Sequence, residues 1–301
     1  MPYFVTAKGG RTEGLSHRHA HEHTQTTFST VFLLFLSCFV IVVVGAQMVP
    51  SNSHCSMLVL DHVVGGLANV VAARHMFADM LFSLTSANIV GVTFADQAYL
   101  SCLGSERRCA LVVHVGDTYT QVVPVVRPGN AAARLPEPLL FAAQASTHAG
   151  AYVTSVLADE LRYQAELFEE CTEEAYGGEK TRVIVDDIKK QCCFVSVDYM
   201  SDLQSCSQSP ALEVSYALPD GAQVTFGAER FRCYEGLFNP TSAHSLPAII
   251  KSCLDACPAQ YREELMANVV LSGGVTLAQN FTERLVKELQ GMGACVFNLY
   301  L

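Results

Sequence analysis

Charged residues are scarce in this 301-residue chain, and basic ones are the scarcest. Only 16% of residues are charged, with 19 Lys and Arg against 29 Asp and Glu. The shortage of basic side chains argues against nucleic-acid binding, because phosphate recognition depends on clustered Lys and Arg. Half of the residues are hydrophobic, which excludes a disordered chain for the bulk of the sequence. The length suits about two domains and a large core.

Cys-x-x-Cys spacing is also absent. The twelve cysteines are scattered, and the closest are the adjacent Cys192 and Cys193 and the Cys253-x3-Cys257 pair. This spacing excludes a zinc ribbon, and a long, core-rich chain is unlike the small secreted scaffolds that depend on disulfides. We therefore expect buried, reduced cysteines that pack as hydrophobic residues.

The first 27 residues are predicted to be a disordered, histidine-rich tail. They contain a Gly-Gly pair, many Ser and Thr, and histidines at every second position, His17, His19, His21 and His23. Alternating histidines of an extended strand are able to bind a metal weakly, but the composition favours a polar tail.

An apolar segment follows at residues 28–46, with 19 residues and no charge. Its length is close to the roughly 20 residues that span a bilayer. Three interpretations remain open: a signal anchor, a cleaved signal peptide with small residues at Val44–Ala46, or a gene-model artefact that is not part of the working protein. A membrane location is expected only if the segment is a genuine anchor.

Hydrophobic periodicity predicts a mixture of strands and helices beyond this segment. Strands are expected at 57–60, 110–115, 119–126, 212–218, 223–226, 269–272 and 295–301. Helices are expected at 68–84, 94–103, 151–171, 182–197, 246–257 and 282–289, and loops at 128–138, 173–180 and 202–209. This alternation is typical of an α/β fold.

Four segments resemble the actin family, in the family's order. Ala95–Val125 is similar to its central helix, turn and β-hairpin, and Val185–Tyr199 to its Asp-Ile-Lys helix. Ser215–Pro240 contains the Leu-Pro-Asp-Gly hairpin and the Glu-Arg-Phe-Arg-Cys run, and Val269–Gln290 contains the Ser-Gly-Gly turn. The resemblance extends over residues 57–301 and is weak before Ala95.

The resemblance implies an actin-like ATPase fold, in which two RNase H-like α/β domains enclose a nucleotide cleft. No Asp-x-Gly-Ser-Gly hairpin precedes Met57, so the family's first phosphate loop is missing. Actins also continue beyond the position of Leu301 to return to the first domain. We therefore expect a nearly complete second domain at 107–301 and only a remnant of the first at 57–104.

Six residues match positions that contact nucleotide in actins. They are Gly116 and Asp117 in the second phosphate turn, Gly150 near the ribose, Lys189 under the adenine, and the Gly273–Gly274 pair. Backbone N–H groups in tight turns are able to surround anionic oxygens when glycine allows close approach. A Gly-Gly after a strand also has a simpler interpretation, a packing turn between strand and helix.

The phosphate side departs from the family pattern. His114 stands where actins have the aspartate that orders metal-bound water, and Thr118 replaces a glycine. A neutral imidazole is a poor substitute, since Mg²⁺ takes oxygen ligands. Gln97 falls at the position of the glutamine that positions the attacking water, but it is also an ordinary polar helix residue.

The adenosine side departs as well. Lys190 replaces a glutamate that binds the ribose hydroxyls, Ala278 replaces an aromatic residue beside the base, and Ala151–Tyr152 replaces Arg-Asp. Phosphoryl transfer depends almost entirely on positioning and electrostatics. We therefore predict no ATPase activity and doubtful binding of ATP or ADP, with Mg²⁺ only alongside a nucleotide.

The resemblance implies a structural subunit of a cytoskeletal or motor-adaptor assembly, with protein partners. Cys193–Ser196 is similar to the dynactin pointed-end subunit. The alternatives are a nuclear subunit of a chromatin-remodelling complex, and an ATP-binding actin-like ATPase whose gene model is incomplete. The expected location is the cytoplasm and cytoskeleton, or the nucleus for the first alternative.

Overall fold

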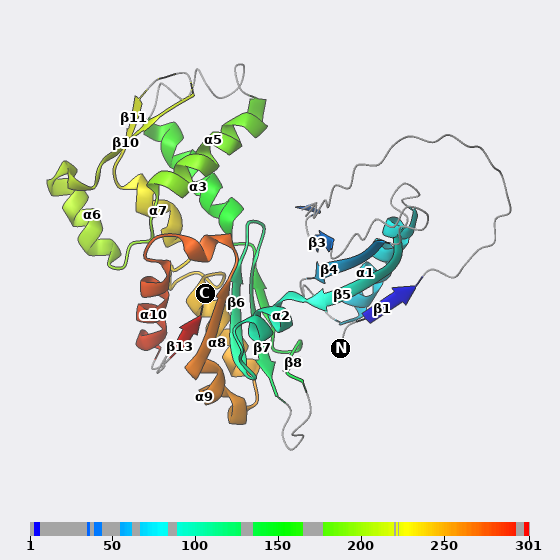
Figure 1. The fold of residues 1–301 in the computed structure, drawn as a ribbon. Coiled ribbons are helices and arrows are strands. Elements are labelled where there is room, and N and C mark those ends of the chain that lie inside the picture. The colour runs from blue at the N-terminus through cyan, green and yellow to red at the C-terminus, as the bar shows by residue number, and fades with distance from the viewer. Residues whose placement is uncertain are drawn as a thin grey trace, which may run out of the picture. The chain divides into compact units, whose positions relative to one another are not determined.

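The structure is a computed structural model. It describes residues 3–6, 35–36, 39–43, 55–61, 67–83, 89–127, 135–164, 177–219, 221, 223–292 and 298–300. The chain divides into two compact units, unit 1 at Met1–Leu100 and unit 2 at Ser101–Leu301 (Figure 1). Their boundary lies within helix α2 (Gln97–Gly104).

Unit 1 contains a five-stranded sheet in the order β1-β5-β4-β3-β2. Its strands are β1 (Tyr3–Thr6), β2 (Phe35–Leu36), β3 (Phe39–Val43), β4 (Cys55–Asp61) and β5 (Ile89–Asp96). Helix α1 (Leu67–Ser83) connects β4 to β5, which are parallel. Parallel neighbours need such a crossover, and α1 packs through Phe77, whose ring lies edge-on to Phe94 at 6.4 Å.

The N-terminal strands differ in part from the prediction. Tyr3–Thr6 forms β1, which pairs antiparallel with β5, although residues 1–27 are predicted to be disordered; the four alternating histidines lie outside the described residues. Part of segment 28–46 forms the strands β2 and β3, and β3 pairs antiparallel with β4; the three interpretations of this segment stay open. Among the described residues, no helix has the length and apolarity needed to cross a membrane.

The helix predicted at 94–103 begins three residues later, at Gln97. Phe94–Asp96 belong to β5 because the apolar, β-branched run before them pairs with β4 along its length. The Asp96 carboxylate then accepts a hydrogen bond from the Tyr99 N–H at 2.8 Å. A side-chain acceptor at this position satisfies an unpaired N–H of the first turn.

Unit 2 is built on a six-stranded sheet, in the order β13-β12-β6-β7-β8 with β9 also on β7. These strands are β6 (Ala110–Val115), β7 (Thr120–Val126), β8 (Glu137–Pro138), β9 (Gln144–Ser146), β12 (Asn268–Ser272) and β13 (Asn298–Tyr300). The predicted antiparallel hairpin of β6 and β7 is confirmed. Strand β12 lies parallel to β6, which places Ser272 beside His114. Strand β8 falls within the loop predicted at 128–138.

Helices α8 (Leu246–Ala256), α9 (Ala259–Ala267) and α10 (Phe281–Gly291) lie around this sheet (Figure 1). The rest of unit 2 comprises α3 (Gly150–Gln164), α5 (Gly177–Cys192), α6 (Tyr199–Gln208) and α7 (Glu229–Glu235). With them are the predicted hairpin of β10 (Val214–Ala217) and β11 (Gln223–Phe226), and the short turns η1 (Pro210–Leu212) and η2 (Gly274–Leu277). The sequence patterns do not predict α9.

Two helix boundaries in this part differ from prediction. Helix α5 includes Gly177–Lys180, where a polar break is predicted, and ends at Cys192 instead of 197. The predicted loop at 202–209 lies mostly in α6, which Asp198 caps by accepting from the Ser201 N–H at 3.3 Å.

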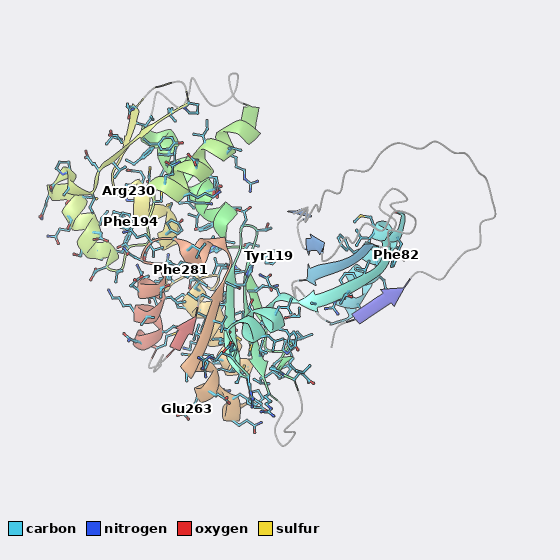
Figure 2. The ribbon with its side chains drawn as sticks, in the orientation of Figure 1. Phe82, Tyr119, Phe194, Arg230, Glu263 and Phe281 are labelled. Carbon is cyan, nitrogen blue, oxygen red and sulfur yellow. The ribbon has the colours of Figure 1, made fainter. Side chains whose placement is uncertain are left out.

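The stretch after α5 is extended because tertiary hydrogen bonds replace helical ones. The Phe194 N–H donates to the Arg230 carbonyl at 3.1 Å, and the Val195 N–H donates to the Gln279 carbonyl at 2.9 Å. The Arg230 guanidinium lies 5.0 Å from the centre of the Phe194 ring, and Figure 2 shows the two side chains near each other.

The cysteine prediction is confirmed for the part of the chain whose side chains are described. Eight cysteines there are free thiols, and all but Cys206 are buried. Burial raises the pKa of Cys102 to about 11 and is the main cause that raises the pKa of Cys109 to about 12. These thiols are therefore protonated at neutral pH and pack as small apolar groups.

Candidate functional site

The six predicted nucleotide-contacting residues all belong to unit 2, and the structure brings them together. Gly116 and Asp117 form the turn between β6 and β7, and Gly150 is the first residue of α3. Lys189 lies near the end of α5, and Gly273–Gly274 lie where β12 meets η2. Gln97 begins α2 and belongs to unit 1.

The β6–β7 turn is attached directly to the start of α3. The N–H groups of Gly150 and Ala151 donate to the carbonyls of Gly116 and Asp117, at 2.9 and 2.7 Å. A Cβ atom at Gly150 would lie 3.1 Å from the Asp117 Cα and 3.1 Å from a methyl of Val275. Glycine is therefore suited to this position because three segments meet closely there.

Gly273 and Gly274 differ in what surrounds them. Gly273 has φ of +96°, and a Cβ there would lie 2.3 Å from the Val115 carbonyl oxygen. This geometry requires glycine for backbone packing alone. A Cβ at Gly274 would meet nothing within 4 Å, so only Gly274 faces open space.

Lys189 is buried, with 6% of its surface exposed. Its Nζ donates to the Gly150 carbonyl at 3.2 Å and to the Thr154 hydroxyl at 2.7 Å, and forms an ion pair with Asp186 at 2.5 Å. An ammonium group has three donor hydrogens. These three partners match its entire donor capacity and neutralise its charge.

Asp186 is a site residue that the sequence patterns do not predict. Its carboxylate pairs with Lys189 and, at 2.6 Å, with Lys190 on the next turn of α5. Burial alone would raise the pKa of Asp186, but hydrogen bonds and charge from the two lysines outweigh it and hold the pKa below its ordinary value. The same carboxylate raises the pKa of Lys190. The i, i+3 and i, i+4 spacing is the sequence signal for this pairing.

His114 occupies the space beside the phosphate turn. Its Nδ1 lies 3.0 Å from the Ser272 hydroxyl, and a Cβ at Gly116 would lie 2.9 Å from its Nε2. Asp117 pairs with Arg182 of α5 at 3.1 Å, and both side chains are more than half exposed. Such an exposed pair contributes little to stability.

The described donors do not fit a magnesium ion bound as in actins. Mg²⁺ requires oxygen ligands in near-octahedral geometry, whereas His114 presents nitrogen and the Asp117 carboxylate pairs with Arg182. Within the described ranges, no group of three or more His, Cys, Asp and Glu residues is arranged to hold a metal.

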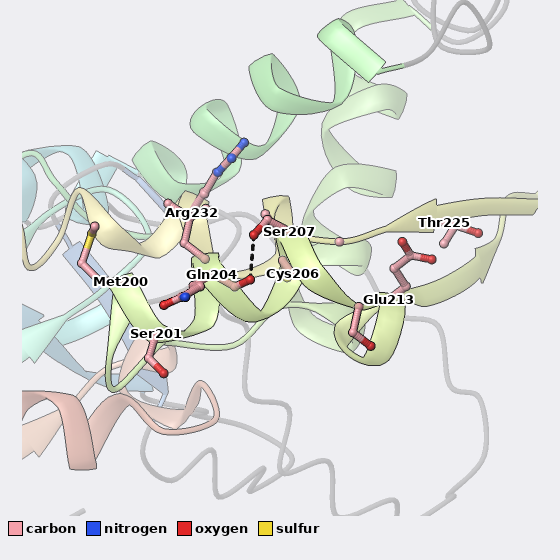
Figure 3. Close-up of a pocket in the computed structure, with 12 residues that line it drawn as sticks. Met200, Ser201, Gln204, Cys206, Ser207, Glu213, Thr225 and Arg232 are labelled. Carbon is pink, nitrogen blue, oxygen red and sulfur yellow. Dashed lines mark hydrogen bonds between the residues drawn. The ribbon is translucent and has the colours of Figure 1, made fainter.

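A separate pocket of about 1200 Å³ lies between α6, β11 and α7 (Figure 3). It is lined by Met200, Ser201, Leu203, Gln204, Cys206, Ser207, Ser209, Glu213, Thr225, Gly227, Ala228 and Arg232. None of the six predicted residues lines it. It is therefore a different site from the turn at Gly116.

Comparison with known proteins identifies relatives. A family model described as Actin matches residues 47–297. Actin-like protein 7A of Mus musculus is 32% identical over 223 residues, which cover 73% of this chain and 46% of the relative. The Homo sapiens protein of the same name is 32% identical over 225 residues, with the same coverage. Actin-like protein 7B of Rattus norvegicus is 32% identical over 221 residues, 72% of this chain and 48% of the relative.

The chain thus spans about half the length of the curated relatives it matches. The match begins directly after the apolar segment 28–46. It includes all four segments that resemble actins and all six candidate residues. The α/β architecture around the β6–β7 turn agrees with this match, and the chain is a member of the actin family.

Proposed function

We propose that this chain is a structural actin-related subunit of a cytoskeletal assembly, with a cleft that neither binds Mg-ATP tightly nor hydrolyses it. The observation that carries the proposal is the hydrogen bonding of Lys189. Its three partners are Gly150, Thr154 and Asp186. A nucleotide that used this lysine would have to displace one of them.

The phosphate turn supports the same proposal. Thr118 adds a side chain where close approach of phosphate favours glycine. The His114 ring lies against Gly116 and presents nitrogen where actins have a carboxylate, with the Ser272 hydroxyl 3.0 Å from its Nδ1. Phosphoryl transfer needs a bound cation to neutralise developing charge, and these residues are poorly suited to supply one.

Two points together support a structural role: the chain belongs to the actin family, and its cleft residues are poorly suited to bind and hydrolyse Mg-ATP. The curated relatives are named actin-like proteins, and an actin-family chain without turnover still presents a folded surface to protein partners. The similarity of Cys193–Ser196 to the dynactin pointed-end subunit does not refine the partner, because all four residues are buried.

Calorimetric titration of the full chain with Mg-ATP, together with a phosphate-release assay, tests the proposal. We expect no micromolar binding and no turnover. The Asp186→Asn variant tests the role of the ion pair, since it leaves Lys189 with a weaker partner, and we expect it to bind nucleotide more tightly without hydrolysing it. Asp255→Asn, at an exposed position of α8, is the matched control. Micromolar binding with turnover in the unmodified chain would overturn the proposal.

A further inference from the structure

Two histidines of unit 2 face each other beside the start of α3. His148 precedes α3 and His244 precedes α8. Their ring centres lie 5.5 Å apart, with planes inclined at 51°. The His148 ring also stacks on Tyr152 at 4.1 Å, with planes only 8° apart. The stacking fixes the plane of one imidazole, while His244 is exposed to solvent.

A buried hydroxyl holds the two backbones together. Ser146 at the end of β9 is 5% exposed. Its Oγ donates to the His244 carbonyl at 2.8 Å and accepts from the His148 N–H at 3.1 Å. The Thr120 hydroxyl donates to the His148 carbonyl at 2.7 Å. The pair is therefore positioned by β7 and β9, which belong to the central sheet.

One ring nitrogen of this pair has no partner. The Nδ1 of His148 is buried and forms no hydrogen bond within the described part of the chain. A buried polar atom without a partner costs roughly 1–3 kcal/mol, and most such atoms in native proteins are satisfied. In the tautomer that carries its proton on Nε2, this nitrogen has a free lone pair and is able to bind a cation.

We propose that His148 and His244 bind a borderline divalent cation of the Zn²⁺ class, with ligands that are not among the six candidate nucleotide residues. Zinc binds imidazole nitrogen at about 2.0–2.1 Å, so two imidazoles on one tetrahedral ion have ring centres about 5 Å apart. The observed 5.5 Å is close to this separation. Water would supply the remaining ligands from the solvent side of His244, which is exposed; among the described residues, no group of three or more His, Cys, Asp and Glu residues is arranged to hold a metal. Hard cations such as Mg²⁺ are excluded because they prefer oxygen.

Calorimetric titration with ZnCl₂ tests the site in the full chain. The parent carries His17, His19, His21 and His23 as alanine, which removes binding by the tail. We expect His148→Ala and His244→Ala each to abolish the same one zinc ion per chain, and the double variant to lose no more. His75→Ala, at an exposed position of α1, is the matched control and keeps that ion.

Two further variants separate loss of the zinc ligand from a folding defect and from loss of ligand orientation. His148→Leu preserves an apolar side chain beside Tyr152 if alanine disturbs the fold, and it also loses the ion. Ser146→Ala retains both imidazoles and weakens zinc binding by about tenfold or more, because partners that orient metal ligands contribute on that scale. An unchanged zinc stoichiometry and affinity in folded His148→Leu and His244→Ala would overturn the proposal, as would equal competition by Mg²⁺.

Discussion

Lys189 and His148 are both nitrogen-bearing side chains near the start of α3, but their surroundings are opposite. The Lys189 ammonium has three protein partners and a neutralising carboxylate. The His148 Nδ1 is buried without a hydrogen bond among the described residues. The family resemblance points to a ligand at Lys189, whereas the polar groups of the structure point to one at His148. The two positions therefore differ in whether their polar atoms are already paired within the protein.

The largest expected effect is the loss of Lys189. Lys189→Ala leaves the Asp186 carboxylate with only Lys190, and removes a donor from the Gly150 carbonyl. We expect unfolding free energy to fall by about 3 kcal/mol, the scale for breaking a buried ion pair, as measured by urea denaturation. Lys190→Ala is the control: this lysine is 68% exposed, so its loss costs less than about 1 kcal/mol. Equal losses of unfolding free energy in the two variants would show that the Lys189–Asp186 pair contributes no more than the exposed Lys190–Asp186 pair.

A second effect separates packing from ligand contact within the Gly-Gly pair. Gly273→Ala places a methyl against the Val115 carbonyl at a positive φ, and we expect a loss of about 2–3 kcal/mol from strain and crowding. Gly274→Ala meets open space and changes stability by less than about 1 kcal/mol. Thermal denaturation of both variants measures the difference, and similar stabilities would argue against the packing role of Gly273.

A smaller effect of opposite sign is expected at His148. In the absence of zinc, His148→Leu removes an unsatisfied buried nitrogen and keeps an apolar side chain against Tyr152. We expect a gain of about 1 kcal/mol in unfolding free energy, since replacing an unsatisfied polar group relieves its desolvation cost. A loss of stability on urea denaturation in metal-free buffer would show that the nitrogen is satisfied in solution.

The smallest expected effect is on the stability of the chain at acidic pH. The pKa of Asp186 is lowered in the folded chain, so its contribution to stability is fully present above the ordinary Asp value of about 3.9. It is lost as pH falls through the lower folded pKa. Asp186→Asn should therefore flatten the stability profile below about pH 4, measured by urea denaturation as the pH is lowered from neutral. An unchanged profile would mean that other carboxylates account for acid sensitivity.

Much of the unit 2 fold follows from sequence, and the reasons are local. The β6–β7 and β10–β11 hairpins lie at Gly116–Asp117 and at the Leu-Pro-Asp-Gly turn, where turn chemistry agrees with β-branched flanks. The misplaced boundaries depend on tertiary contacts. Phe94–Asp96 is a strand because β4 pairs with it, and α5 ends at Cys192 because Arg230 and Gln279 accept the next N–H groups.

The candidate site was predicted as a set of positions, and the structure places all six together. The sequence does not predict which contacts these residues make in the folded chain. Periodicity and motif matching do not reveal that Asp186 pairs with Lys189, nor that the Val115 carbonyl fills the space beside Gly273. The His148–His244 pair arises from residues 96 positions apart whose backbones meet at Ser146, and no local pattern predicts such a contact.

The most direct test of the central claim observes the Lys189 ammonium itself. Nitrogen-15 NMR of the lysine side chains, with Lys189 assigned from a Lys189→Arg variant, reports its hydrogen bonding while Mg-ATP is added. We expect a resonance in slow exchange with solvent that does not shift when nucleotide is added. A shift that saturates at micromolar Mg-ATP would show that the lysine exchanges its protein partners for nucleotide, and the proposal of a cleft without tight Mg-ATP binding would then be wrong.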